Sequence, residues 1–225
     1  MSLSDELKLV LFDFDGTLCD SASTIIHLMQ RAADEVGVNL PDEKTIRGNI
    51  GYGVAHVALD YAGGDEALAE QLALRYRKLS QETYYQPEPP LDPLFDGAVT
   101  CLNLLSEQGY LLGIATNKSR APLLSLLQRH QIDTLFDVVM SVDDAPAKPS
   151  GEMAREALRR TGADASHTVL VGDTIIDAGC AEDARIAFLG VEWGYHPVAA
   201  LQQKGAKEII SDFAQLPEIL HRILP

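Results

Sequence analysis

The chain has 225 residues, and 18 Lys and Arg residues against 33 Asp and Glu residues give it a formal charge of −15 at pH 7. Its 46% hydrophobic and 23% charged residues are typical of a folded globular protein, either one large domain or a core with an inserted module. This acidity disfavours nucleic-acid and membrane partners. The three cysteines form no disulfide or zinc pattern, and no signal peptide or long apolar run is evident, so we expect a cytoplasmic protein.

Short apolar segments alternate with helical patterns along most of the chain. Segments typical of buried parallel strands occupy residues 9–14, 110–115, 136–140, 168–171, 186–191 and 208–210. Helical patterns lie at residues 97–108, 120–130, 151–161, 175–184, 198–204 and 215–223. The alternation predicts an α/β fold, a doubly wound, Rossmann-like parallel sheet with helices on both faces and with ligands at the carboxyl ends of its strands.

The interval between the first two predicted strands breaks this alternation. It contains helical patterns at residues 23–36 and 66–85 and no strand. We therefore predict an α/β core domain of residues 1–20 and 91–225 and an inserted helical cap domain of residues 21–90. Residues 18–21 and the proline-rich segment 87–93 are the predicted hinges on which the cap closes over the sheet edge.

Polar residues follow four of the predicted strands where they reach this edge. They are Asp13 and Asp15 after the first strand, then Thr116 and Asn117, then Lys148, and finally Asp173 and Asp177. Two carboxylates about 4 Å apart repel by roughly 4 kcal/mol even at an effective dielectric constant of 20. One lysine cannot neutralise four carboxylates, so the pattern predicts a divalent cation that prefers oxygen ligands. Mg²⁺ fits best, because no His or Cys cluster accompanies these residues.

With these four motifs in this order, the chain resembles the phosphatases of the haloacid dehalogenase superfamily. Its helical insertion is similar to the cap of phosphoglycolate phosphatase-like members. The resemblance implies that Asp13 attacks the phosphorus of a monoester and forms an aspartyl-phosphate. Asp15 then protonates the leaving group and later deprotonates the attacking water.

The resemblance also assigns the remaining polar residues. Thr116 and Lys148, with Asn117, hold the phosphoryl oxygens. The carboxylates of Asp13 and Asp173 and the main-chain carbonyl of Asp15 hold Mg²⁺, and Asp177 orients Lys148 and metal-bound water. The predicted function is Mg²⁺-dependent hydrolysis of a small phosphorylated metabolite similar to phosphoglycolate, by a monomer or homodimer.

Two alternatives to this function stay open. One is a phosphosugar mutase or other phosphotransferase of the same superfamily, and the other is a non-catalytic phospho-switch or binding module. Dehalogenation is disfavoured, because the resemblance implies that dehalogenating members lack an acid at the position of Asp15.

Substrate specificity is predicted to lie in the cap, because the four loops are occupied with phosphate and metal. Residues 47–53 contain three glycines, which favour a turn that brings backbone close to a ligand. Arg47 and Tyr52 in this turn are the predicted substrate contacts. The alternative is that Arg47 is a solvated surface residue and that Tyr52 serves packing.

Overall fold

The computed structural model describes residues 7–86 and 90–224, so residues 87–89 of the predicted proline hinge lie outside the described part. Six strands, all paired in parallel, form one sheet in the spatial order β3-β2-β1-β4-β5-β6. The strands are β1 (Leu9–Phe12), β2 (Leu111–Ala115), β3 (Val138–Met140), β4 (Thr168–Gly172), β5 (Ala187–Val191) and β6 (Glu208–Ile210). The predicted parallel α/β sheet is confirmed, and β1 lies at its centre.

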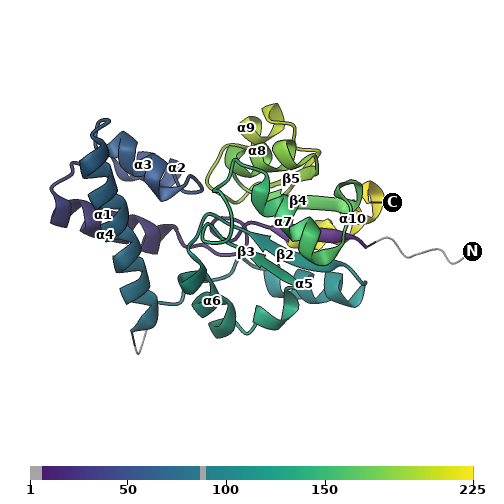
Figure 1. The fold of residues 1–225 in the computed structure, drawn as a ribbon. Coiled ribbons are helices and arrows are strands. Elements are labelled where there is room, and N and C mark those ends of the chain that lie inside the picture. Colours follow the sequence, from purple (N-terminus) through teal and green to yellow (C-terminus); the bar gives the residue numbers. More distant parts are fainter. Residues whose placement is uncertain (1–6, 87–89, 225) are drawn as a thin grey trace, which may run out of the picture.

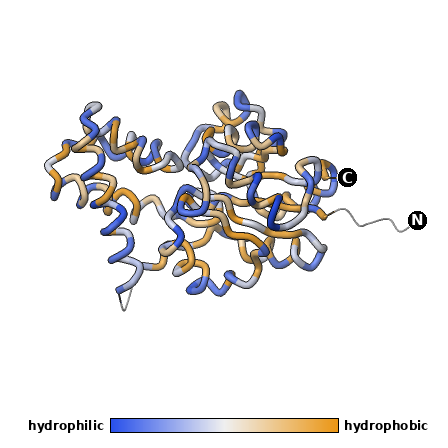
Figure 2. The backbone as a smooth tube through the Cα atoms, in the orientation of Figure 1, coloured by the Kyte–Doolittle hydropathy of each residue, from blue (hydrophilic) through white to orange (hydrophobic). Residues whose placement is uncertain are grey.

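Helices cover both faces of the sheet (Figure 1). One apolar cluster joins Val10 and Phe12 to α5 (Ala98–Glu107), α6 (Arg120–Arg129) and α10 (Leu216–Ile223). A second cluster lies on the opposite face, where the strands pack against α7 (Glu152–Thr161), α8 (Ile175–Ala184) and α9 (Val198–Gln203). Successive strand residues point to opposite faces. Burial of both faces therefore explains why the strands are mostly hydrophobic, and in Figure 2 much of the tube inside the core is orange.

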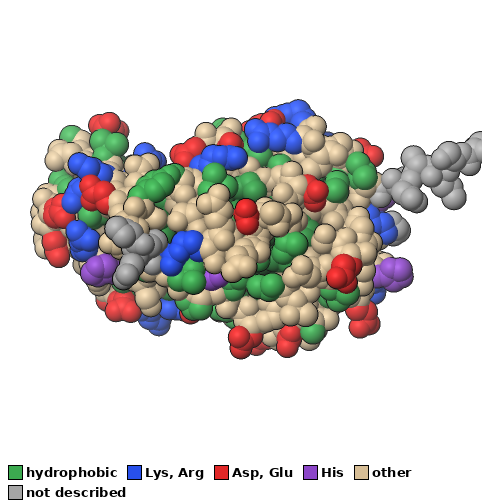
Figure 3. Space-filling view, turned by 90° about the horizontal axis from the view of Figure 1, so that it is seen from below, with side chains coloured by type: hydrophobic (Ala, Val, Ile, Leu, Met, Phe, Trp, Pro, Cys, Tyr) green, Lys and Arg blue, Asp and Glu red, His purple; other side chains and the backbone are tan. Residues whose placement is uncertain are grey.

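Three single-turn 3₁₀ helices complete the core at Asp133–Leu135, Ala165–His167 and Phe213–Gln215. None of the described helices is long and apolar enough to cross a membrane. On the face drawn in Figure 3, acidic, basic and hydrophobic side chains are interspersed.

The helical insertion packs around an apolar cluster of its own and lies to one side of the core (Figure 1). Its helices are α1 (Ala22–Val36), α2 (Glu43–Gly48), α3 (Val54–Tyr61) and α4 (Glu66–Tyr85). Sequence analysis predicted α1 and α4 but not the two shorter helices.

The predicted turn over residues 47–53 begins too early, because Arg47 and Gly48 form the last turn of α2. The side chain of Asp42 caps the start of this helix by accepting a hydrogen bond from the amide of Thr45. The helix has only six residues, too few to show a helical repeat in the sequence. The turn proper follows it, and Gly51 has a positive φ of 102° there.

Candidate active site

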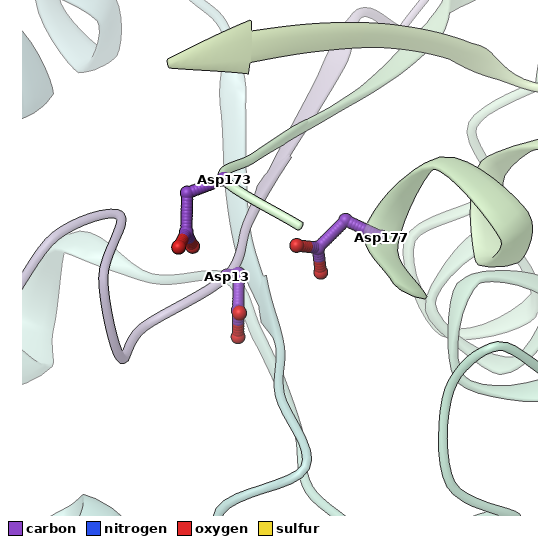
Figure 4. A group of neighbouring side chains, drawn as sticks. All are labelled: Asp13, Asp173 and Asp177. Atoms are coloured by element: carbon purple, nitrogen blue, oxygen red, sulfur yellow. The ribbon is translucent and has the colours of Figure 1, made fainter. Parts of the chain in front are cut away.

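Three buried carboxylates meet at the carboxyl ends of β1 and β4. Asp13 follows β1, and its amide still donates to the carbonyl of Val171 in β4. Asp173 follows β4 directly, and Asp177 lies in the first turn of α8. Carboxylate oxygens of these three residues lie within 4.8 Å of one another (Figure 4). The central position of β1 and β4 in the sheet thus brings residues 160 positions apart in the sequence into one group.

Lys148 is the cation of this group. Its ammonium nitrogen lies 2.9 Å from Oδ1 of Asp13 and 2.6 Å from Oδ1 of Asp177, and its side chain is 1% exposed. Burial by itself lowers the pKa of Lys148, but the two carboxylates outweigh it and raise that pKa above its usual range. Lys148 is therefore charged, and three carboxylates face a single ammonium group.

The other carboxylate oxygens are held by hydroxyl and amide donors. Asp173 accepts from the hydroxyl of Thr17 at 2.8 Å and from the amide of Tyr195 at 2.9 Å. Thr174 is the N-cap of α8, and its hydroxyl donates to the carboxylate of Asp177 at 2.6 Å. The hydroxyl oxygen of Thr174 in turn accepts from the amide of Asp177. This capping box, which the sequence places between β4 and α8, fixes the carboxylate of Asp177.

The electrostatics of the group fit a divalent cation. Burial and the neighbouring Asp177 raise the pKa of Asp13 to about 7 against the attraction of Lys148, and burial raises the pKa of Asp173 well above its usual range. When all three carboxylates are ionised, one ammonium group leaves two negative charges to be balanced. The donors are hard carboxylate oxygens, which suit Mg²⁺ better than softer metals.

The carboxylate of Asp15 lies outside this group. It accepts a hydrogen bond from the hydroxyl of Ser21 at 2.6 Å and pairs with the ammonium of Lys118 at 3.0 Å. Burial lowers the pKa of Lys118, but Asp15 raises it above the usual range. Lys118 was missed by sequence analysis. Its position directly after Thr116 and Asn117 was the signal, since a lysine in that loop lies at the same sheet edge.

Thr116 and Asn117 follow β2 at this edge, as predicted. Thr116 is buried, and its hydroxyl accepts from the amide of Lys118 at 3.3 Å. The side-chain amide of Asn117 donates to the carbonyls of Gly51 and Lys148, and its oxygen accepts from the amide of Lys148. Asn117 therefore joins the loop that carries Lys148 to the cap.

A cavity of about 150 Å³ lies between these loops and the cap, and Asp13, Asp15 and Thr116 line it. Tyr52 also lines it, and its contact with substrate stays a prediction. Arg47 is not among its lining residues, because its guanidinium carbon lies over the ring of Tyr195, 5.1 Å from the ring centre, on an exposed side of α2. The structure thus separates the two cap residues that the sequence had grouped.

The end of α2 and the segment that joins it to α3, residues 49–53, contact the core. Nε2 of His196 lies 3.0 Å from the carbonyl of Gly48, and Nδ1 of the same ring accepts from the amide of Ile175 at the start of α8. Burial lowers the pKa of His196, which favours the neutral ring that these two contacts require. These contacts, with the bond from Asn117 to the carbonyl of Gly51, join the cap to the core beside the cavity.

Comparisons with known proteins agree with this geometry. The model of the haloacid dehalogenase-like hydrolase family matches residues 10–191. The "Probable phosphatase IndB" of Dickeya dadantii is 34% identical, and the alignment covers 96% of this chain and 94% of that protein. The "Phosphoglycolate phosphatase" of Rhodospirillum rubrum is 30% identical over 95% of this chain and 90% of its own length. A haloacid dehalogenase-like family hydrolase from Streptococcus pneumoniae has a TM-score of 0.77 at 26% identity, covering 95% of this chain and 98% of that one.

Proposed function

The chain belongs to the haloacid dehalogenase-like hydrolase family, as its motifs indicated, and from that premise we propose that it hydrolyses the phosphomonoester of a small phosphorylated acid similar to phosphoglycolate. The observation that carries the proposal is the buried group of Asp13, Asp173, Asp177 and Lys148, of which Asp13 lines the cavity between the core loops and the helical cap. Such a group suits the binding and transfer of a phosphoryl group.

Asp13 is the proposed nucleophile. The ammonium of Lys148 lies beside Oδ1 of Asp13, and the amide of Phe14 donates to the same oxygen at 2.7 Å. Oδ2 of Asp13 has no such donor among the described residues. In the proposed reaction Oδ2 attacks phosphorus, the bond to the leaving alkoxide breaks, and an aspartyl-phosphate forms. Water then attacks phosphorus, and Asp13 is released as a carboxylate. Lys148 and the hydroxyl of Thr116 hold phosphoryl oxygens during both steps.

Asp15 is the proposed acid and base. It lines the cavity beside Asp13, where a leaving oxygen would lie. It would give a proton to that oxygen in the first step and take one from water in the second. Its present partners, Ser21 and Lys118, hold the carboxylate next to the cavity.

Asp13 and Asp173 are the proposed Mg²⁺ ligands, together with the main-chain carbonyl of Asp15. Mg²⁺ would supply positive charge that stabilises the phosphoryl oxygens and reduces repulsion among the carboxylates. Asp177 is already engaged by Lys148 and Thr174, which supports its proposed role in orienting Lys148.

The relatives support hydrolysis of a small acid. A protein named phosphoglycolate phosphatase aligns over 95% of this chain. We therefore rank hydrolysis of a small phosphorylated acid ahead of transfer between sugar hydroxyls.

The test is phosphate release from phosphoglycolate, a hexose phosphate and p-nitrophenyl phosphate, each with Mg²⁺ and with chelator. We expect Mg²⁺-dependent release that is fastest from phosphoglycolate. Asp13→Asn should abolish it, because an amide is no nucleophile, whereas Asp34→Asn, an exposed substitution in the cap, should leave it unchanged. Turnover by Asp13→Asn at near the unmodified rate, or full activity after exhaustive chelation, would refute the mechanism.

A further inference from the structure

One cation in the wall of the cavity has no acidic partner. Lys118 and Arg77 are the Lys and Arg residues that line the cavity, and Lys118 is paired with Asp15. Arg77, in α4, has no carboxylate within ion-pair distance among the described residues. Its neighbours on the same helix differ, since Arg75 pairs with Glu35 and Lys78 lies 3.9 Å from Glu82. The cations that face away from the cavity are neutralised, and the one that lines it is not.

The surroundings of Arg77 make this isolation significant. Tyr76, Arg77 and Ser80 line the cavity from one turn of α4. The rest of the cap wall is largely apolar, with side chains such as Ile25, Met29, Ile46, Ile50, Val54 and Val57. Arg77 is half-buried, and a cation placed among apolar groups gives up hydration unless a partner compensates for it. A bound anionic group would supply that partner.

The positions of the cations around the cavity lead to the same conclusion. The phosphoryl end of the cavity has its own cations, since Lys148 faces Asp13 and Lys118 faces Asp15. Arg77 lies on the cap side, so a substrate that uses all of these groups would have a phosphate at one end and a second anion at the other. A planar guanidinium donates two parallel hydrogen bonds to a carboxylate.

We propose that Arg77 binds a carboxylate of the substrate and so selects short phosphorylated carboxylic acids over neutral phosphomonoesters. This assignment rests on the proposed phosphatase function and adds a specificity-determining residue to it. The apolar wall around Arg77 acts in the same direction. Sugar hydroxyls placed against it would lose hydrogen bonds to water and gain none.

The assignment differs from the one that the sequence suggested. Arg47 is exposed and lies over the ring of Tyr195, outside the cavity lining, whereas Arg77 is half-buried and inside it. The sequence did not single out Arg77, because Arg77 lies between Arg75 and Lys78 in a long, charged helical pattern, which is typical of a solvated helix face. Only the closure of α4 over the core loops gives it a role.

The test compares two substrates of equal length. 2-Phosphoglycolate and ethyl phosphate differ in that a carboxylate replaces a methyl group, so the ratio of their kcat/KM values isolates recognition of the carboxylate. We expect Arg77→Gln to lower this ratio by roughly ten- to a hundredfold, mainly through KM for phosphoglycolate, with little change for ethyl phosphate. Lys78→Gln removes the same charge one residue away, outside the cavity lining, and should leave the ratio unchanged.

The outcomes separate this inference from the proposed function. Wild-type protein that hydrolyses phosphoglycolate, with a ratio that Arg77→Gln leaves unchanged, overturns the role of Arg77 and leaves the phosphatase intact. A selective loss in Arg47→Gln but not in Arg77→Gln also overturns it and restores the assignment suggested by the sequence. Equal losses on both substrates in Arg77→Gln indicate a role in cap structure, which contradicts carboxylate recognition. Wild-type protein that releases phosphate from neither substrate refutes the proposed function itself.

Discussion

Gly51 lies where the cap loop touches the core, and we predict that Gly51→Ala weakens cap closure. Its φ of 102° is in the left-handed region, and a Cβ there would lie 2.7 Å from Cγ2 of Thr174. Thr174 is fully buried, and its hydroxyl bonds to Asp177, so its methyl group cannot turn away without breaking the N-cap of α8. Either the cap loop moves off the core, or the residue that holds Asp177 moves.

The magnitude follows from a matched control. Gly64, in the same cap, also has a positive φ, 88°, but a Cβ there would meet no atom within 4 Å. Gly64→Ala therefore carries the backbone strain of about 1 to 2 kcal/mol without the steric contact. Forcing an extra methyl group into a packed contact adds about 1 to 3 kcal/mol. The equilibrium constant for cap closure should accordingly be lower in Gly51→Ala than in Gly64→Ala by roughly five- to 150-fold.

The assay is kcat/KM for phosphate release, measured beside the free energy of unfolding in urea for both variants. We expect a larger loss of kcat/KM in Gly51→Ala, because the loop must separate from Asn117 and Thr174 to accommodate the methyl group. The loss should exceed that of Gly64→Ala even where the two variants unfold at similar urea concentrations. Equal activity in the two variants would show that contact between this loop and the core does not govern turnover.

Three further predictions concern the charged groups. Asp15→Asn retains acceptors for Ser21 and Lys118 but cannot carry the proton, so kcat with an alkyl phosphate should fall ~10² to 10⁴-fold, and a loss under about threefold contradicts its role. Mg²⁺ at 100 times its Kd should stabilise the fold by about 2.7 kcal/mol. In calorimetry this raises Tm by roughly 5 to 11 °C, and Asp173→Asn should reduce the rise. Burial lowers the pKa of His196 below 6.5 in the folded protein. Below pH 6.5 the unfolded chain therefore binds more protons at this residue than the folded protein does, and the free energy of unfolding falls as the pH falls. Between about pH 7.5 and pH 5.5 the Tm of His196→Gln should therefore fall by less than the Tm of the unmodified protein. Equal decreases in Tm would exclude a contribution from His196.

The core and the residues at its sheet edge were predictable because local patterns and one topological rule determine them. The central strands β1 and β4 are buried on both faces, and the carboxyl ends of parallel strands meet at one edge. Asp13, Lys148 and Asp173 therefore had to converge once their strands were recognised. The structure adds distances, such as the 2.6 Å between Lys148 and Asp177, that no pattern in the sequence contains.

The cap was predictable only in outline. Its long helices α1 and α4 show a helical repeat over 15 and 20 residues, whereas α2 and α3 have six and eight residues and were not recognised. The orientation of a helix relative to the core depends on tertiary packing, which a repeat does not encode. This is why the sequence favoured Arg47, beside a glycine-rich turn, while the structure places Arg77 in the cavity.

The contacts between cap and core involve the same residues that hold the buried charged groups. Asn117 bonds to the main chain of Lys148 and to the carbonyl of Gly51. Thr174 holds Asp177 and packs against Gly51. The amide of Tyr195 donates to Asp173, and its ring supports Arg47 of the cap. Three core loops that position a charged group therefore also contact the cap, so we expect displacement of the cap to free the residues that hold Lys148, Asp177 and Asp173 from their cap contacts. If closure of the cap positions these charged groups, phosphoryl transfer would be efficient only in the closed state, in which the cavity is shielded from bulk water.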